Sequence, residues 1–409
     1  MSSSDKTYTI AVIGGGIAGA AVARDAALRG LSVIVFEKNT LGSGASSKSS
    51  KLIHGGIRYL ELAWADFKKL RWAGAAKNFR FVFSSLRETR ILAETAPDLV
   101  QPISLFVPIY RKGSRGPFSV YFGTFFYSFL SRLAGNHYKP KIFRGAESAH
   151  AALPLLKEGS LVGAVEIIDH TTDDQALVQA VADSAQKSGA VFLEHTPVLS
   201  WKKCPEGYEL TVQSENGVKT FQAKTIVNAS GAWIDKTRGE SISPPDRYVF
   251  PVGGSHIELP AFLGRSAILE AGDGRLFFVI EKNGRARVGT TEWPADDPDH
   301  VSVPEKDVEY LLHSLARYFP SKQWDHSVIL SSDAGLRPLA FNPLTLQANT
   351  VSREHTLRMD SDGVFYLIGV KLTDHRRAAE ETVDRLLKKL GRKWVQSKTR
   401  TTPLLCRLK

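Results

Sequence analysis

Apolar residues near the start of the chain form two short runs separated by a stretch of small residues. The runs at 8–13 and 31–36 are rich in β-branched side chains, which is typical of strands buried on both faces of a parallel sheet. Residues 17–29 are mostly small and are followed by Gly30, which indicates a helix. The pattern predicts an α/β fold that opens with a Rossmann-like strand–helix–strand unit.

Three glycines occupy the turn between the first strand and the helix. In a dinucleotide-binding turn, Gly14 permits the tight bend, Gly16 lets a pyrophosphate approach the backbone, and Gly19 lets helix and strand pack closely. Glu37 ends the second strand 18 residues after Gly19, where an acid accepts hydrogen bonds from ribose hydroxyls. An acid here disfavours the 2′-phosphate of NADP, but it does not distinguish FAD from NAD.

The residues after Glu37 separate these two cofactors. NAD enzymes usually continue from the second strand into a helix, whereas residues 38–50 are small and polar and lead into Lys-Leu-Ile-His-Gly-Gly at 51–56. Such a loop can lay its backbone and hydroxyls along an extended cofactor. A flexible linker is the alternative, but a linker needs neither the apolar pair at 52–53 nor the two glycines. The loop therefore favours FAD.

Later strand patterns, such as Leu-Phe-Phe-Val-Ile at 276–280, predict a second, antiparallel sheet of α+β character that holds the substrate. The predicted layout is discontinuous. Residues 1–60, 160–240 and 325–395 form the FAD-binding domain, residues 61–160 and 241–325 form the substrate domain, and residues 396–409 form a basic tail.

The composition excludes several classes of protein. The 409 residues are 43% hydrophobic, which is enough for a large core. The two cysteines, Cys204 and Cys406, indicate neither a disulfide framework nor a metal site and fit a reducing compartment. The N-terminus lacks the apolar region of a signal peptide, and no apolar run reaches the roughly 18 residues of a spanning helix. We expect a cytoplasmic protein.

The formal charge of +11 leaves three kinds of partner open. Nucleic acid, an anionic membrane surface and a small anionic substrate each exploit such a charge. No zinc-finger spacing or RNP-type motif is present, so nucleic acid is not expected. A basic surface without a specific partner is the remaining alternative.

Several separated segments carry a common resemblance. They include Ser-Ser-Lys-Leu-Ile-His-Gly-Gly-Ile-Arg-Tyr-Leu-Glu at 49–61, Val-Asn-Ala-Ser-Gly-Ala-Trp-Ile-Asp at 227–235, Gly-Ser-His-Ile at 254–257, Val-Gly-Thr-Thr-Glu at 288–292, Gly-Leu-Arg-Pro-Leu at 335–339 and Lys-Leu-Thr at 371–373. Together they resemble the FAD-dependent glycerol-3-phosphate dehydrogenases, within the D-amino-acid-oxidase-like flavoproteins. The match runs in order over roughly residues 8–390.

The resemblance implies a specific reaction. sn-Glycerol 3-phosphate is oxidised to dihydroxyacetone phosphate, with hydride transfer to flavin N5 and electrons passed to quinone. It also implies peripheral attachment to the inner face of the cytoplasmic membrane. One alternative is a related oxidase of another hydroxy or amino acid that yields hydrogen peroxide. The other is a flavin-binding paralogue without catalysis.

The chemistry of this oxidation requires cations for the anionic end of the substrate and a base for the hydroxyl proton. Guanidinium forks bind two phosphate oxygens at once. We expect Arg58, Arg337 and Lys371 to surround the phosphate and the developing oxyanion. Arg353 and Tyr59 are further expected substrate contacts.

His256 is the expected base, and Arg337 and Arg58 complete the expected catalytic set. His256 belongs to the Gly-Ser-His-Ile segment, and an ordinary pKa near 6.5 suits a base at neutral pH. A histidine satisfied within the core is the structural alternative for this residue. His54, beside the glycine pair, is an alternative base.

The expected non-covalent FAD contacts come from the glycine turn, the serine-rich loop and the segments that return to the cofactor. They are Gly14, Gly16, Ile17, Ala18, Gly19, Glu37, Lys38, Ser46, Ser47, Ser49, Ser50, Lys51, Leu52, Ile53, His54, Gly55, Val198, Ala229, Gly231, Trp233, Gly335, Gly369, Lys371, Leu372 and Thr373.

The sequence departs from the family pattern near the expected substrate site. Val370, Asp374 and His375 replace a glycine, a threonine and a tyrosine, and Gly253 stands where a lysine usually precedes Gly-Ser-His. An arginine usual in the segment 173–177 is missing. Family members typically continue into a helical C-terminal domain, whereas this sequence ends at 409. These differences bear on the substrate and the acceptor more than on the flavin.

Two segments suggest contact with a membrane. Residues 117–130 hold seven aromatic side chains, and nine Lys or Arg residues follow Asp384 without an acid. The aromatic segment is either a membrane-interface element or a helix packed in the substrate domain. The basic stretch either meets anionic headgroups or is a solvated helix end.

Overall fold

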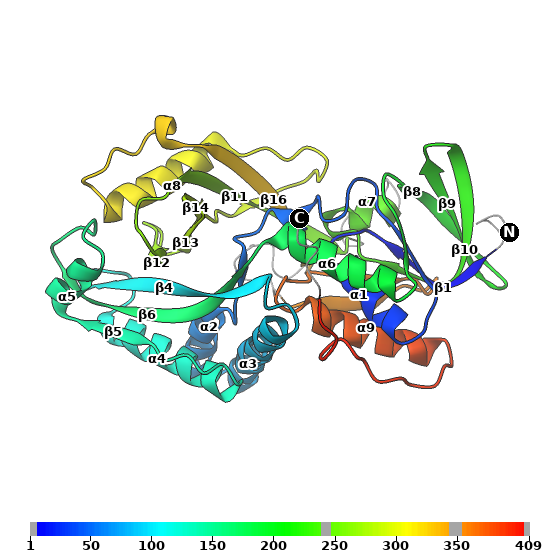
Figure 1. The fold of residues 1–409 in the computed structure, drawn as a ribbon, viewed down its shortest axis with the longest axis horizontal. Helices are drawn as coiled ribbons and strands as arrows, with labels where there is room; N and C mark the ends of the chain where they lie inside the picture. Colours follow the sequence, from blue (N-terminus) through cyan, green and yellow to red (C-terminus); the bar gives the residue numbers. More distant parts are fainter. Residues whose placement is uncertain (1–5, 239–246, 343–353, 405–409) are drawn as a thin grey trace.

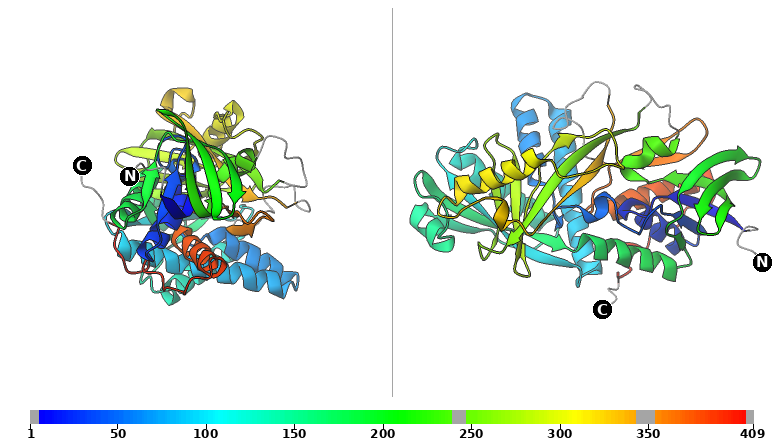
Figure 2. Two further views of the ribbon diagram at one scale, coloured as in Figure 1. Left: turned by 90° about the vertical axis from the view of Figure 1, so that its right-hand side faces the viewer. Right: turned by 90° about the horizontal axis from the view of Figure 1, so that it is seen from above.

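The computed structural model describes residues 6–238, 247–342 and 354–404. Two sheets lie at opposite ends of an elongated molecule (Figures 1 and 2). This arrangement confirms the α/β fold class with a Rossmann-like unit and a second sheet. Among the described helices, none combines the length and the apolar composition that a membrane crossing requires.

The first sheet contains the strand–helix–strand unit predicted from the sequence. Its central strands β2 (Val33–Phe36), β1 (Thr7–Ile13), β10 (Gly217–Asn228) and β18 (Phe365–Ile368) are parallel neighbours in that order. The other members are β7 (Val191–Leu193), β8 (Val198–Cys204), β9 (Gly207–Ser214) and β17 (Thr356–Met359).

Three helices cover one face of this sheet: α1 (Ile17–Leu28), α6 (Asp174–Lys187) and α9 (His375–Lys389). Alternate residues of β1 divide between two cores. Ile10 and Val12 pack with the helices, whereas Ala11 and Ile13 pack on the side of the β8–β10 strands. Burial on both faces explains the unbroken apolar runs in these strands.

The second sheet is mainly antiparallel and is built on two long strand pairs. These pairs are β4 (Val100–Tyr110) with β6 (Leu161–Thr172), and β11 (Val249–Pro260) with β16 (Ser331–Ala340). The other members are β3 (Leu52–Ile53), β5 (Lys141–Arg144), β12 (Ser266–Glu270), β13 (Leu276–Lys282), β14 (Arg285–Gly289) and β15 (Trp293–Pro294).

Helices cover both faces of the second sheet. The helices α2 (Ile57–Lys68), α3 (Trp72–Thr95) and α4 (Pro117–Leu133) lie on one face, and α5 (Gly145–Ala152) and α8 (Glu305–Tyr318) lie on the other. The remaining short helices are α7 (Ile234–Arg238), η1 (Ala45–Ser47), η2 (Gly231–Trp233) and η3 (His326–Val328).

The chain crosses between the sheets at the serine-rich loop. β2 ends at Phe36 in the first sheet, and β3, only two residues long, pairs with β6 in the second. The predicted domain boundaries near 160 and 325 assign β6 and β16 to the FAD-binding domain, but both strands pair in the second sheet. The serine-rich loop, β6 and β16 therefore place parts of the second sheet next to the first sheet.

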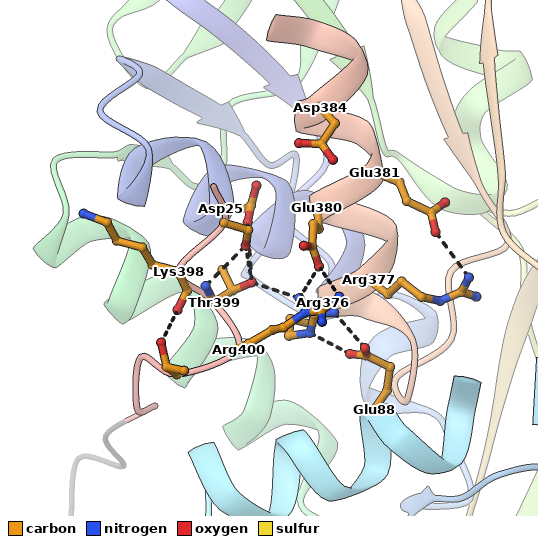
Figure 3. A network of polar contacts seen from close by, with 12 residues as sticks. Asp25, Glu88, Arg376, Arg377, Glu380, Glu381, Asp384, Lys398, Thr399 and Arg400 are labelled. Atoms are coloured by element: carbon orange, nitrogen blue, oxygen red, sulfur yellow. Dashed lines mark hydrogen bonds and ion pairs between the residues drawn. The ribbon is translucent and has the colours of Figure 1, made fainter. Parts of the chain in front are cut away.

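The chain beyond α9 returns to pack against the first helix. Ser397 donates a hydrogen bond to Asp25 on α1 at 2.5 Å, and the backbone N–H of Leu404 bonds to the carbonyl of Thr95. Arg376 on α9 forms a bidentate ion pair with Glu88 on α3, with both hydrogen bonds at 2.7 Å (Figure 3). The described part of the basic tail is therefore tied into a buried network.

Candidate active site

A cavity of about 530 Å³ lies where the two sheets approach each other. Its lining comes from the ends of β1, β2 and β10 in the first sheet, and from β11 and β16 in the second. The serine-rich loop and the segment 369–373 complete the wall. Ligands of open α/β sheets bind at the carboxyl ends of parallel strands, and this cavity has that position.

The glycine turn forms one end of the cavity. Gly14 has a φ of +103°, and a Cβ on Gly19 would lie 1.9 Å from the carbonyl oxygen of Gly14, so both positions require glycine. A Cβ on Gly16 would meet only the Ser46 hydroxyl, at 3.1 Å, so the backbone there faces the opening. The N-terminus of α1 begins next, at Ile17. This cradle fits the pyrophosphate of FAD.

Glu37 stands at the ribose position and also braces the turn. Its carboxylate accepts hydrogen bonds from the N–H groups of Gly15, at 2.7 Å, and Asn39, at 2.9 Å. Lys38 and Trp233 form the rim beside it, with the Lys38 Nζ 4.2 Å from the centroid of the indole ring. Val198 lines the same region.

Most of the expected FAD contacts line this cavity. Besides those already placed, they are Ala18, Ser46, Ser49, Ser50, Leu52, His54, Ala229, Gly231, Gly335, Gly369, Lys371, Leu372 and Thr373. The serine-rich loop packs closely against β16 at Gly335. A Cβ at this position would lie 2.6 Å from the Cβ of Lys48, so the close contact requires glycine.

Five of the expected FAD contacts support the wall from behind. Gly19 packs helix on strand as described, and the Ser47 hydroxyl donates to the carbonyl of Gly44. Lys51 forms an ion pair with Asp174 at 2.6 Å, which directs its amine to α6. Ile53 is fully buried in β3, and the N–H of Gly55 bonds to a tyrosine hydroxyl of α4.

Four of the expected substrate contacts line the cavity, and we name the part that they form the substrate end. They are Tyr59, His256, Arg337 and Lys371. Arg337 donates to the Thr290 hydroxyl at 2.7 Å, and the Lys371 Nζ lies 4.3 Å from the centroid of the Tyr59 ring.

Of the other two expected arginines, the structure describes the backbone of one and does not describe the other. Arg58 lies in the first turn of α2, and its side chain is not among the described groups. Arg353 falls outside the described residues.

His256 is buried, with 3% of its surface exposed. Its Nε2 lies 2.9 Å from the hydroxyl of the cavity-lining Ser50. Burial first, and then the charges of Arg287, Arg337 and Lys51, hold the pKa of His256 well below its ordinary value. The expectation of an ordinary pKa near 6.5 is therefore wrong. The ring is therefore uncharged at neutral pH, and its unprotonated nitrogen can accept a proton, but the lowered pKa makes it a weaker base than an ordinary histidine.

Of the four substituted positions Gly253, Val370, Asp374 and His375, three lie outside the cavity lining. Asp374 accepts a hydrogen bond from the Ser85 hydroxyl of α3 at 3.1 Å, and His375 Nδ1 donates to the carbonyl of Leu372 at 2.6 Å. Gly253 lies under the indole of Trp293, where a Cβ would be 2.2 Å from the ring. Only Val370 lines the cavity.

The cavity also contains residues that the sequence interpretation did not single out. They include Arg275, Phe278, Thr290 and Glu292. The segment Val-Gly-Thr-Thr-Glu at 288–292 is a signal for part of this set, because it resembles a family segment. For Phe278, the sequence indicated only that it belongs to an apolar strand.

The fold, the glycine cradle and the adjoining cationic end define a dinucleotide-dependent oxidoreductase. The family model described as FAD dependent oxidoreductase, DAO, matches residues 9–382. The chain therefore belongs to this family and is an FAD-dependent oxidoreductase, which confirms the predicted cofactor.

Similar proteins support this placement. A glycerol-3-phosphate dehydrogenase of Synechocystis is 33% identical over 97% of this chain and 73% of its own length. A D-erythritol 1-phosphate dehydrogenase of Brucella abortus is 34% identical over 93% of this chain and 74% of its own. The solved glycerol-3-phosphate dehydrogenase of Bacillus halodurans, complexed with FAD, has a TM-score of 0.77 at 25% identity and covers 98% of this chain and 68% of its own.

Proposed function

We propose that the protein oxidises sn-glycerol 3-phosphate to dihydroxyacetone phosphate. The observation that carries this proposal is the shared cavity, in which the glycine cradle is continuous with Arg337, Lys371 and a neutral histidine. Relatives named for glycerol 3-phosphate agree with it.

The residues that line the cavity have separate roles in the proposed reaction. Arg337 and Lys371 hold the phosphate and the developing oxyanion, with Arg58 as a third cation from α2. His256 accepts the hydroxyl proton at Nε2, the ring nitrogen beside Ser50. The glycine turn and the serine-rich loop would hold FAD, which would supply the acceptor for the hydride of the carbinol carbon. The buried setting excludes water from the imidazole, which stays uncharged until the proton is transferred.

The acceptor is proposed to be a quinone, reached at an anionic membrane surface. The outer face of α4 supports this because its phenylalanines are exposed, with Phe118 at 82% and Phe125 at 62%. A second, larger hollow of about 1270 Å³ lies beside this face and shares Ile57 and Leu276 with the first cavity. Exposed aromatic side chains beside basic ones are typical of membrane interfaces.

Anaerobic bleaching of the yellow, FAD-loaded protein tests the substrate. Glycerol 3-phosphate should bleach the flavin within seconds, whereas glycerol and lactate should leave it oxidised, since neither carries the phosphate that the cations hold. D-Erythritol 1-phosphate belongs in the panel because the Brucella relative bears its name. Bleaching by that compound alone would replace the proposed substrate, and stoichiometric peroxide in air would identify an oxidase.

Flotation with liposomes tests the membrane proposal. The protein should float with anionic vesicles at low salt and remain behind with neutral ones, because its net charge is +11. Replacing Phe118 and Phe125 by serine should weaken flotation without changing anaerobic bleaching. An absence of flotation at low salt would contradict the proposal.

A further inference from the structure

Tyr127 is a buried side chain that the proposed chemistry does not use. It lies on the inner face of α4, opposite the exposed phenylalanines, with 1% of its surface exposed. Its hydroxyl is 2.7 Å from Asp169 Oδ2 on β6 and 2.9 Å from the backbone nitrogen of Gly55. Because the N–H of Gly55 must donate, the tyrosine hydroxyl accepts there and gives its own hydrogen to Asp169.

Gly55 occupies a sensitive place in the wall of the cavity. Its neighbours His54 and Gly56 both line the cavity, and Gly56, with a φ of +78°, precedes the first turn of α2. That turn carries Tyr59, which lines the substrate end. A shift of Gly55 therefore moves groups expected at both the flavin and the substrate.

The segment 54–56 is held from two sides. On one side, the His54 N–H donates to the Thr373 hydroxyl at 3.2 Å. On the other side, Tyr127 binds the N–H of Gly55. A Cβ at position 55 would lie 2.6 Å from Leu86 and 2.9 Å from the Tyr127 hydroxyl, so there is no room for a side chain at this position. The hydroxyl of Tyr127 is thus the polar anchor of this backbone on the α4 side.

We propose that Tyr127, oriented by Asp169, is a positioning residue that fixes the backbone at 54–56 and the start of α2 against the FAD and the substrate. The assignment to substrate turnover rests on the proposed function. The assignment to the cavity wall rests on the contacts alone. Misplacement of reacting groups by about 1 Å costs up to ~100-fold in rate.

The role of Asp169 is to accept a hydrogen bond rather than to supply a charge. It has no ion pair among the described residues, and Tyr127 is the side chain that bonds it. His170, the next residue on β6, packs against the ring of Tyr138. Burial raises the pKa of Asp169 to about 8, so the carboxyl is mostly neutral at pH 7. An amide at this position retains the accepting oxygen, whereas an aliphatic side chain of similar size does not.

Three variants test the inference: Tyr127→Phe, Asp169→Asn and Asp169→Leu. Hydrogen exchange of the peptide covering 52–60 is measured in the flavin-free protein, and the rate of flavin reduction is measured after loading with FAD. Tyr127→Phe and Asp169→Leu should speed exchange at Gly55 at least about 10-fold and slow reduction by about 10- to 100-fold. Asp169→Asn should keep both the exchange rate and the reduction rate within about threefold of the wild type, because the amide retains the accepting oxygen. A merely space-filling role for Asp169 would not predict this difference between the Asn and Leu variants.

The outcomes separate this inference from the proposed function. Unchanged exchange and reduction in Tyr127→Phe, a variant that keeps the ring and its packing, would overturn the inference. Equal losses in Asp169→Asn and Asp169→Leu would overturn the part assigned to the accepting oxygen. If glycerol 3-phosphate fails to reduce the wild type, the proposed function fails, while the exchange measurement still decides the role of Tyr127.

Discussion

Burial controls the charge of the key titratable side chains at and behind the cavity. It lowers the pKa of His256 well below 6.5 and raises the pKa of Asp169 to about 8. Both shifts keep the neutral form of the group at pH 7. A neutral histidine can take a proton from a substrate, and a neutral carboxyl can sit in an apolar wall without a counter-charge.

Replacement of His256 should remove the base but not the flavin. His256→Ala should slow flavin reduction about 100-fold or more while FAD remains bound, as is typical for loss of a general base. At saturating substrate, the wild-type rate should also lack the loss that a histidine of ordinary pKa would cause as the pH falls from 7 to 6, because burial holds the pKa of His256 well below 6.5. Stopped-flow reduction over this pH range is the measurement, with the exposed His326→Ala as the control. Reduction at an unchanged rate would remove His256 as the base.

The raised pKa of Asp169 predicts a pH-dependent change in stability. In the unfolded chain the carboxyl ionises near pH 4, whereas in the native protein it retains its proton to about pH 8. The native state therefore binds more protons at Asp169 in this window, and the contribution of this group to the free energy of unfolding falls by about 1.4 kcal/mol per pH unit between those values. The melting temperature of Asp169→Asn, relative to the wild type, should rise from pH 5 to pH 8. A constant difference would contradict the raised pKa.

The first strand–helix–strand unit illustrates how single elements follow from local patterns. The expected strand at 8–13 is β1 (Thr7–Ile13), and the expected helix at 17–29 is α1 (Ile17–Leu28). The glycines between them have distinct structural surroundings. Gly19 touches the backbone of Gly14, whereas Gly16 faces the cavity.

This difference predicts opposite effects of adding one methyl group. Gly19→Ala should lower the stability of the flavin-free protein by about 1–3 kcal/mol, since its Cβ collides with backbone. Gly16→Ala should leave that stability nearly unchanged but weaken FAD binding about 10-fold or more, because the methyl group occupies the pyrophosphate position. Thermal melts and flavin fluorescence titrations check the pair. Equal effects on stability would refute this division of roles.

At the scale of the whole molecule, one loop of the second sheet reaches the rim of the nucleotide end. Asp299, between β15 and α8, accepts hydrogen bonds from Lys38 at 2.7 Å and from the indole of Trp233 at 2.6 Å. It also pairs with Lys236 at 2.6 Å, which in turn bonds Asp297. Lys38 and Trp233 line the cavity, so this network joins the two sheets at the rim beside Glu37.

Loss of this network should speed the release of FAD. Asp299→Asn should increase the dissociation rate about two- to fivefold, since partly exposed ion pairs contribute up to about 1 kcal/mol each. High salt should speed release from the wild type and have less effect on the variant. Flavin fluorescence after dilution is the measurement, with Asp325→Asn, at a position outside the cavity lining, as the control. Identical release and salt dependence in both proteins would exclude this role.

The sequence by itself determined the cofactor and its cradle. The glycines, the ribose acid and the serine-rich loop lie within about fifty consecutive residues, and their roles depend on local backbone geometry. Short, nearly unbroken apolar runs likewise determined two of the central strands, β1 and β2. The division into domains and the roles of the individual site residues remain predictions.

Only the tertiary structure decided which side chains meet. His256, Arg337 and Lys371 come from separate segments and share a cavity because β11, β16 and the 369–373 segment converge on it. Asp374 and His375 break the family pattern yet lie outside the cavity lining. The neutral state of His256 depends on burial, and the hydrogen bond from the Gly55 N–H to the Tyr127 hydroxyl depends on contact between distant segments. Burial and long-range contacts arise when distant segments pack together, so a local sequence pattern cannot predict them.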